Sequence, residues 1–335
     1  MIQPLVCGAD LGGTSTRVTI SDLSGYRHGT GRAGGGNPTT HGAAAAAESL
    51  SIALRAALAG LDPARVRALV LGLAGGGALV DPRVAAVYDD MLRSVGVLVA
   101  PIVVGDALCA FTSATAEPDG TVLLAGTGAA AARVRGLQLY ETADGWGWLL
   151  GDHGSAYWIG REAVRAVLAE VGAVGPPTTL RAAICAELLD RVPGDPIRDR
   201  NELINAAAAR PPIQLATLAT LVVAGERSGD AASAQICDRA AELLCDTVGL
   251  VRNAAEATPI VVSGSVVRAA DSSVGSRVRT LLARRFTGAV LAPTDGTLGA
   301  TWLAIRALDP DGDLAAAHHR LSDAADLAPG QRGGG

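Results

Sequence analysis

Two glycine-rich turns in the sequence have the residue types that can hold an anionic phosphate. The first follows the apolar run at residues 5–10, and the second follows the apolar run at residues 122–125. Strand-forming residues flank both turns, which predicts hairpins whose tips let another group come close to the backbone. Backbone N–H groups and a threonine hydroxyl at such a tip suit phosphate oxygens. The residues expected to contact phosphate are Gly12, Gly13, Thr14, Gly126, Thr127 and Gly128.

Either turn taken alone is equally consistent with an ordinary hairpin. The repetition of the pattern favours phosphate binding by both turns and predicts an internal duplication. Asp10 ends the first apolar run, so its carboxylate is available to hold Mg²⁺ through water.

Asp106 is the candidate catalytic residue. It ends the short strand predicted at residues 102–106, and ligands of α/β sheets bind at the carboxyl ends of strands. A carboxylate there can orient a hydroxyl group and accept its proton during phosphoryl transfer. The alternative is a helix N-cap, which the following Ala-Leu-Cys-Ala also allows. The two flanking turns favour the general base.

The elements around these residues alternate between strands and helices, which predicts an α/β fold. Helices are expected at residues 43–61, 84–95 and 156–171, and further strands at 66–73 and 260–262. A final helix is expected after Gly296.

Composition excludes several classes of protein. The 335 residues, 49% of them hydrophobic, are enough for two domains. The sequence contains no lysine, which excludes a Walker A nucleotide site. A net charge of -5 without a basic stripe argues against nucleic-acid binding.

The five cysteines lie in apolar surroundings without a CxxC pair, so we expect buried thiols in a reducing compartment. We recognise no signal peptide or membrane span, and the prediction is a cytoplasmic protein with no membrane partner.

The ordered set of motifs resembles the actin/hexokinase/Hsp70 superfamily. Within it, the segment Asp144-Gly-Trp-Gly-Trp-Leu-Leu-Gly-Asp152 and its continuation to Gly160 resemble the N-acetylglucosamine kinase and BadF/BadG type family. The resemblance implies two actin-like (ribonuclease H-like) lobes with a cleft and hinge between them. The N-terminal lobe would span 1–118 plus the final helix at 295–310, the C-terminal lobe 119–294, and a weakly ordered tail 311–335.

The resemblance also implies ATP and Mg²⁺ as cofactors, a homodimer, and a sugar as the acceptor of the phosphoryl group. Gly264 and Ser265 would contact the adenosine. The residues expected to contact the sugar are Asn37, Asp106, Asp144, Trp146 and Asp152. Besides the cap alternative for Asp106, the others also have structural alternatives: Asn37 as a turn residue, Asp144 as the closure of an Asx-turn, Trp146 as a core residue and Asp152 as a helix cap. Ser155 is the favoured cap.

The carboxylates of Asp106, Asp144 and Asp152 would make the pocket acidic, which suits the ammonium group of glucosamine better than a neutral acetamide. The predicted reaction is therefore the ATP-dependent conversion of glucosamine to glucosamine 6-phosphate. N-acetylglucosamine kinase is the first alternative. A non-catalytic sugar sensor or an activator ATPase on the same fold is the second, although an activator needs cluster-binding cysteines that this sequence does not offer.

Overall fold

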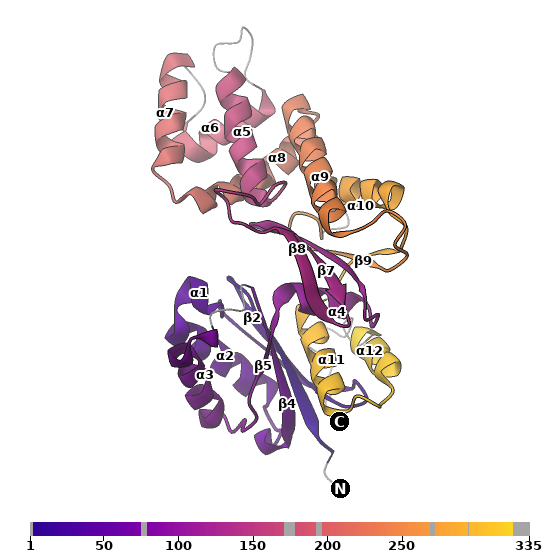
Figure 1. The fold of residues 1–335 in the computed structure, drawn as a ribbon. Helices are drawn as coiled ribbons and strands as arrows, with labels where there is room; N and C mark the ends of the chain where they lie inside the picture. The colour runs from indigo at the N-terminus through magenta and orange to yellow at the C-terminus, as the bar shows by residue number, and fades with distance from the viewer. Residues whose placement is uncertain are drawn as a thin grey trace, which may run out of the picture. The chain divides into compact units, whose positions relative to one another are not determined.

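The computed structural model describes residues 3–74, 79–170, 178–191, 196–268, 272–293 and 295–323. Its chain divides into two compact units. Unit 1 comprises residues 1–119, 134–139 and 293–335, and unit 2 comprises 120–133 and 140–292. The sequence predicts that the N-terminal lobe ends at residue 118 and that the C-terminal lobe ends at residue 294. Figure 1 shows both units with many of their elements labelled.

Unit 1 is built on a five-stranded sheet in the order β3-β2-β1-β4-β5. Its strands are β1 (Leu5–Leu11), β2 (Thr16–Asp22), β3 (Arg27–Ala33), β4 (Val66–Leu73) and β5 (Ile102–Gly105). Its helices are α1 (Pro38–His41), α2 (Ala43–Ala57), η1 (Pro63–Arg65), α3 (Pro82–Ser94), α4 (Asp106–Ala114), α11 (Gly296–Leu308) and α12 (Leu314–Asp323).

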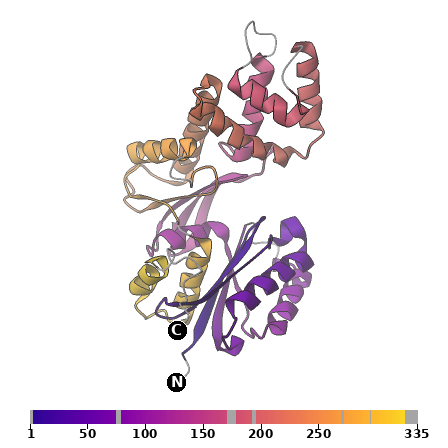
Figure 2. The same ribbon diagram turned by 180° about the vertical axis from the view of Figure 1, so that it is seen from behind.

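Side chains of β1 alternate between two helical layers, because successive residues of a strand point to opposite faces. Leu5, Cys7, Ala9 and Leu11 join the core cluster that includes the buried face of α2. On the other face Gly8 lies against Thr301 of α11, where a Cβ at residue 8 would come within 2.2 Å of the Thr301 nitrogen. Asp10 shares that second face and therefore points toward α11. Figure 2 shows the same layers from behind.

Unit 2 repeats the arrangement with the order β10-β9-β6-β7-β8. Its strands are β6 (Gly120–Ala125), β7 (Ala129–Arg135), β8 (Gln138–Asp144), β9 (Ile260–Ser263) and β10 (Val290–Leu291). Its helices are α5 (Ala156–Glu170), α6 (Thr179–Leu189), α7 (Pro196–Ala208), η3 (Pro212–Leu218), α8 (Ala219–Arg227), α9 (Ala231–Val251) and α10 (Ser273–Arg285). The matching strand orders are what an internal duplication predicts. The α/β class is confirmed.

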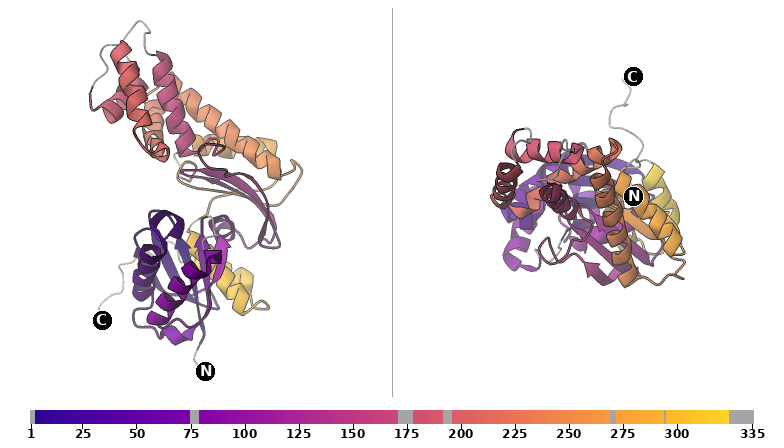
Figure 3. Two further views of the ribbon diagram at one scale, coloured as in Figure 1. Left: turned by 60° about the vertical axis from the view of Figure 1, so that its left-hand side comes forward. Right: turned by 90° about the horizontal axis from the view of Figure 1, so that it is seen from above.

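The helices of unit 2 form two groups. Helices α5 to α8 gather at one end of the unit, as Figure 3 shows, while α9 packs against α10 and β6. Large parts of α5 and α9 are buried in one core cluster together with β6 and β9.

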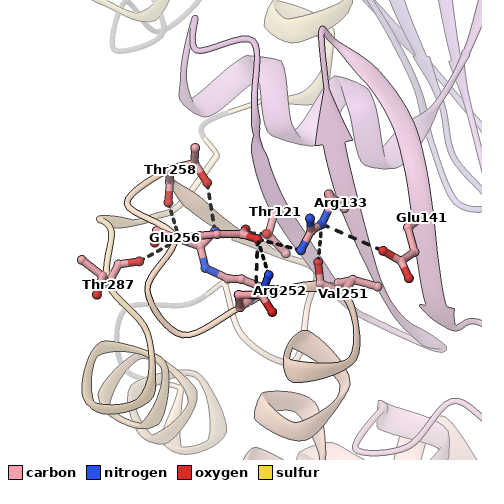
Figure 4. A network of polar contacts seen from close by, with 9 residues as sticks. Thr121, Arg133, Glu141, Val251, Arg252, Glu256, Thr258 and Thr287 are labelled. Carbon is pink, nitrogen blue, oxygen red and sulfur yellow. Dashed lines mark hydrogen bonds and ion pairs between the residues drawn. The ribbon is translucent and has the colours of Figure 1, made fainter.

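A polar network ties the C-terminal end of α9 to the start of β6 (Figure 4). Arg252 is 4% exposed, and its Nη2 donates to the backbone carbonyls of Glu256, Thr258 and Thr287 at 2.5–2.7 Å. Its Nη1 donates to Thr121 Oγ1 at 3.1 Å. Thr121 is the second residue of β6, whereas the glycine-rich turn follows the end of that strand. The network therefore stabilises the end of the sheet that is opposite to the glycine-rich turn.

The C-terminal part of the chain departs from one expectation. Weak order was predicted from residue 311 onward, but Leu314–Asp323 forms α12 with Ala317 and Leu321 buried. Trp302 Nε1 donates to the Leu314 carbonyl at 2.9 Å, which anchors the start of this helix. Residues 324–335 lie outside the described residues.

Among the described residues, no single helix is long and apolar enough to cross a membrane. The segments Ile197–Ala208 and Pro212–Arg227 reach that length and composition only as a pair bent by 118°.

Candidate active site

Asp10 and Arg17 form an ion pair at the end of β1. The β1–β2 register places them directly opposite each other across the hairpin, and Arg17 Nη2 donates to Asp10 Oδ2 at 2.6 Å. Arg17 Nη1 also lies 3.4 Å from Asp295 Oδ1, the N-cap of α11. Burial raises the pKa of Asp10, while the Arg17 guanidinium opposes that rise. One arginine thus pairs with two carboxylates.

The first glycine-rich turn has an open tip. Gly12 closes the turn by donating its N–H to the Ser15 carbonyl at 3.0 Å. Gly13 and Thr14 are exposed, and a Cβ placed on Gly13 would meet no atom within 4 Å. A ligand can therefore approach the backbone at Gly13 without displacing any part of the described chain.

Asp106 is the first residue of α4, which follows β5 directly. Gly105 is the N-cap, so Asp106 is not the cap residue. Its Oδ1 accepts the Ala107 N–H at 2.9 Å. Burial raises the pKa of Asp106, and the nearby negative charge of Asp10 adds to the rise. This is the environment of a carboxylate that can take up a proton.

Asn37 is engaged in the chain itself. It is 6% exposed and caps α1: its Oδ1 accepts the Thr39 N–H at 2.8 Å, and its Nδ2 donates to the Ala74 carbonyl at 3.2 Å. The geometry matches the turn-residue alternative and leaves at most one N–H and one lone pair of this amide for a sugar.

In unit 2, the second glycine-rich turn lies beside the expected adenosine motif. The Val266 N–H donates to the Ala125 carbonyl, and a Cβ on Gly126 would lie 3.8 Å from Ser265 Oγ. Gly264 has a φ of +109°, in the range that favours glycine. Thr127 at the tip is exposed. The structure therefore brings together the two segments that the sequence assigns to phosphate and adenosine.

Helix α5 begins directly against the same turn. The Ala156 N–H donates to the Gly126 carbonyl at 2.8 Å, and the Tyr157 N–H donates to that of Thr127 at 3.3 Å. Ser155 Oγ accepts the Trp158 N–H at 3.2 Å, which confirms Ser155 as the helix cap. The first turn of α5 thereby fixes the carbonyl side of the glycine-rich turn.

Asp144 and Asp152 are both buried, at 8% and 7% exposure, and lie at the two ends of one loop. Asp152 Oδ1 accepts the Ala129 N–H at 3.1 Å, directly after the glycine-rich turn. Burial raises the pKa of Asp152. Asp144 accepts hydrogen bonds from backbone groups of the loop itself, which matches the loop-closing alternative. Trp146, between them, is 65% exposed and free to contact a ligand.

Sequence reasoning missed Arg17 and Asp295. The signal for Arg17 was available, because a four-residue tip at residues 12–15 places Asp10 opposite Arg17 in the hairpin. No local pattern points to Asp295.

The five cysteines are free and buried, as predicted. Across the described part of the chain, no group of three or more His, Cys, Asp or Glu side chains could hold a metal ion. Mg²⁺ would therefore need phosphate or water oxygens in addition to protein carboxylates.

The model of the BadF/BadG/BcrA/BcrD ATPase family matches residues 7–304. The chain belongs to this family. The match spans both glycine-rich turns, Asp106 and the start of α11.

Two characterised relatives are kinases by name. An N-acetylmuramic acid/N-acetylglucosamine kinase of Clostridium acetobutylicum is 28% identical over 179 residues, which cover 53% of this chain and 55% of the relative. An N-acetyl-D-glucosamine kinase of Dictyostelium discoideum is 37% identical over 84 residues, covering 25% and 26%. The chain thus spans about half the length of the first relative and a quarter of the second.

Solved structures share the fold at low sequence identity. A proposed N-acetylglucosamine kinase from Chromobacterium violaceum matches with a TM-score of 0.65 at 20% identity, covering 90% of this chain and 99% of that one. A ROK family glucokinase from Streptomyces griseus matches with a TM-score of 0.51 at 21% identity, covering 90% and 99%. These likenesses confirm the predicted α/β fold class.

Proposed function

We propose that this protein is an ATP-dependent sugar kinase in which Asp106 is the general base. The observation that carries the proposal is the setting of Asp106, a partly buried carboxylate with a raised pKa beside the Asp10–Arg17 pair. Membership of an ATPase family and the names of the two relatives support the same activity.

The residues have complementary roles in this reaction. Asp106 orients the acceptor hydroxyl and takes its proton as the oxygen attacks the γ-phosphorus, and ADP leaves. The turns at Gly12–Thr14 and Gly126–Gly128 hold phosphate oxygens through threonine hydroxyls and through backbone N–H groups other than those of Gly12 and Gly126, which close the turns. Gly264 and Ser265 contact the adenosine.

Mg²⁺ fits the carboxylates of unit 1. Asp10 has one oxygen bonded to Arg17, and Asp295 lies beside it, so both can bind water molecules of a hydrated ion. When bound, Mg²⁺ neutralises charge on the β- and γ-phosphates.

The observations favour an N-acetylated amino sugar as the acceptor of the phosphoryl group. The case for glucosamine needed an acidic pocket that included Asp144, and this carboxylate is instead bonded to its own loop. Both relatives are named for N-acetylated sugars. The exposed indole of Trp146 offers an apolar face for a sugar ring.

A panel assay tests the activity and the choice of sugar. Purified protein with Mg²⁺-ATP is given N-acetylglucosamine, N-acetylmuramic acid, glucosamine or glucose, and ADP and sugar phosphate are quantified. We expect the highest kcat/KM with an N-acetylated sugar. A tenfold preference for glucosamine, about 1.4 kcal/mol, would restore the original prediction. If no sugar in the panel stimulates ADP formation, the proposal of sugar kinase activity is contradicted.

An activator ATPase is disfavoured because such a protein must present cysteines to a bridging cluster, and all five cysteines here are buried. A homodimer and a cytoplasmic location stay predictions. Size-exclusion chromatography with light scattering tests the first.

A further inference from the structure

The carboxylate of Asp144 is the centre of a closed loop in unit 2. Its Oδ1 accepts the N–H groups of Gly145 and Asp152 at 2.8 and 2.6 Å. Its Oδ2 accepts the N–H of His153 at 2.9 Å and lies 3.2 Å from Nδ1 of the His153 ring. The side chain is 4% exposed. With four contacts and little exposure, this carboxylate has no capacity left for a substrate.

The backbone at both ends of the loop is in the left-handed region. Asp144 has a φ of +61° and Asp152 a φ of +57°, a conformation that L side chains rarely adopt. Non-glycine residues remain in this region only when the surrounding contacts fix them. The hydrogen bonds to Asp144 provide that fixation for the whole segment.

Asp152 connects this loop to the second glycine-rich turn. Its Oδ1 accepts the Ala129 N–H, and the single N–H of Gly145 is shared between the Ala129 carbonyl and Asp144 Oδ1. The Asp152 carboxylate also lies directly under Gly128, where an added Cβ would come within 2.9 Å of Oδ1. The position of Asp152 therefore constrains the position of Gly128.

We propose that Asp144 is a positioning residue for the nucleotide, not a ligand of the sugar. Its carboxylate fixes Asp152, and Asp152 holds the Gly126–Gly128 turn in place to receive phosphate. This inference rests on the proposed function only in assigning that turn to the nucleotide, and it can be tested without any sugar.

The test is the affinity of the full-length protein for Mg²⁺-ADP, measured by calorimetry in the absence of sugar. Asp144→Gly removes all four contacts while keeping a residue that accepts a positive φ. We expect it to weaken ADP binding about tenfold, which corresponds to about 1.4 kcal/mol, because the turn is no longer held in place to receive phosphate. Asp144→Asn can keep both Oδ1 contacts and should lie between this variant and wild type.

Asp230→Asn is the matched control. The Asp230 carboxylate is also buried and accepts two backbone N–H groups, from Ser233 and Leu180, but these lie on helices away from the turn. We expect this control to lower Tm and leave ADP affinity within twofold of wild type. All affinities are measured well below the lowest Tm, so that loss of folded protein does not mimic loss of binding.

Kinetics separate positioning from direct contact with the sugar. In the positioning role, Asp144→Asn raises KM for ATP or lowers kcat and leaves the ratio of kcat/KM between two sugars unchanged. The inference is overturned if Asp144→Gly and Asp144→Asn bind ADP like wild type, or if Asp144→Asn alters sugar preference with normal ADP affinity. The kinase proposal fails separately, if the wild-type protein binds ADP but phosphorylates no sugar.

Discussion

Arg17 is the residue that neutralises Asp10: the two face each other across the β1–β2 hairpin, with Nη2 and Oδ2 2.6 Å apart. Asp10 is mostly buried, with 18% of its side chain exposed. Removal of the guanidinium would leave a desolvated carboxylate close to two other carboxyl groups, those of Asp295 and Asp106. The pair is therefore required for the charge balance of unit 1.

The variant Arg17→Leu is expected to lower the free energy of unfolding at pH 7 by about 1–3 kcal/mol, because Asp10 loses its partner. The pKa of Asp10 is already raised by burial, and loss of Arg17 raises it further. Protonation then relieves the penalty, so the difference from wild type should shrink as pH falls through that pKa. Urea unfolding at pH 7 and pH 5 measures both effects. Arg17→Lys, which keeps the charge, should recover part of the loss, and a penalty that grows toward low pH would contradict the pairing.

Gly13 and Gly8 form a matched pair of glycines on the same hairpin. A side chain at Gly13 meets open space, so Gly13→Val should fold with near-normal stability but weaken Mg²⁺-ADP binding at least about tenfold by blocking the phosphate. Gly8→Ala would place its Cβ against the backbone of Thr301 and should cost roughly 3 kcal/mol of folding stability. Calorimetry and urea unfolding of both variants test this contrast. Normal ADP affinity in Gly13→Val would show that the turn does not contact the nucleotide.

Substitution of Arg252 is expected to lower the free energy of unfolding without weakening ligand binding. Arg252→Met removes the donor to three backbone carbonyls, which are left without that hydrogen bond in a buried setting. We expect the free energy of unfolding to fall by about 2–4 kcal/mol. Because the network lies at the start of β6, Mg²⁺-ADP affinity below Tm should stay within about twofold. A variant as stable as wild type would show that these contacts contribute nothing net.

Much of the fold could be predicted because its signals are local. The hairpin at Gly12–Thr14, the strand that ends just before Asp106 and the cap at Ser155 each follow from a few neighbouring residues. The helix at Leu314–Asp323 could not be predicted from local signals. The helix beginning at Leu314 is stabilised by packing on Trp302 and other residues of α11, which its Ala- and Asp-rich sequence does not indicate.

The candidate site was harder to predict for the same reason. The sequence favoured Asp144 as a sugar ligand over a loop closure, whereas its bonds to the backbone of Asp152 and His153 match the loop closure. Asp295 reaches Arg17 across 278 residues, so no spacing rule could connect them. The assignments to nucleotide and sugar stay predictions until ligands are measured.

Acid pH should inactivate the enzyme through Asp106. A general base must be deprotonated, and burial, with the charge of Asp10, holds the pKa of Asp106 above its ordinary value. The kcat/KM for the sugar should therefore fall as pH is lowered through this raised pKa, earlier than an ordinary aspartate would cause. Wild-type kcat/KM measured across pH in overlapping buffers tests the direction of this change. Urea unfolding at the same pH values is the control for stability. A rate that rises as pH falls over this range would argue against a carboxylate base.

The most direct measurement compares sugar-dependent ADP formation by wild type and Asp106→Asn, with N-acetylglucosamine and Mg²⁺-ATP at saturating concentrations. The asparagine has the same shape but cannot accept the proton, so kcat should fall by roughly 10²–10⁴ while ADP and sugar affinities stay within a few-fold. Asp90→Asn, a change of an exposed carboxylate on α3, should leave turnover unchanged. An Asp106→Asn enzyme that keeps more than about a tenth of wild-type kcat would contradict the role of Asp106 as general base.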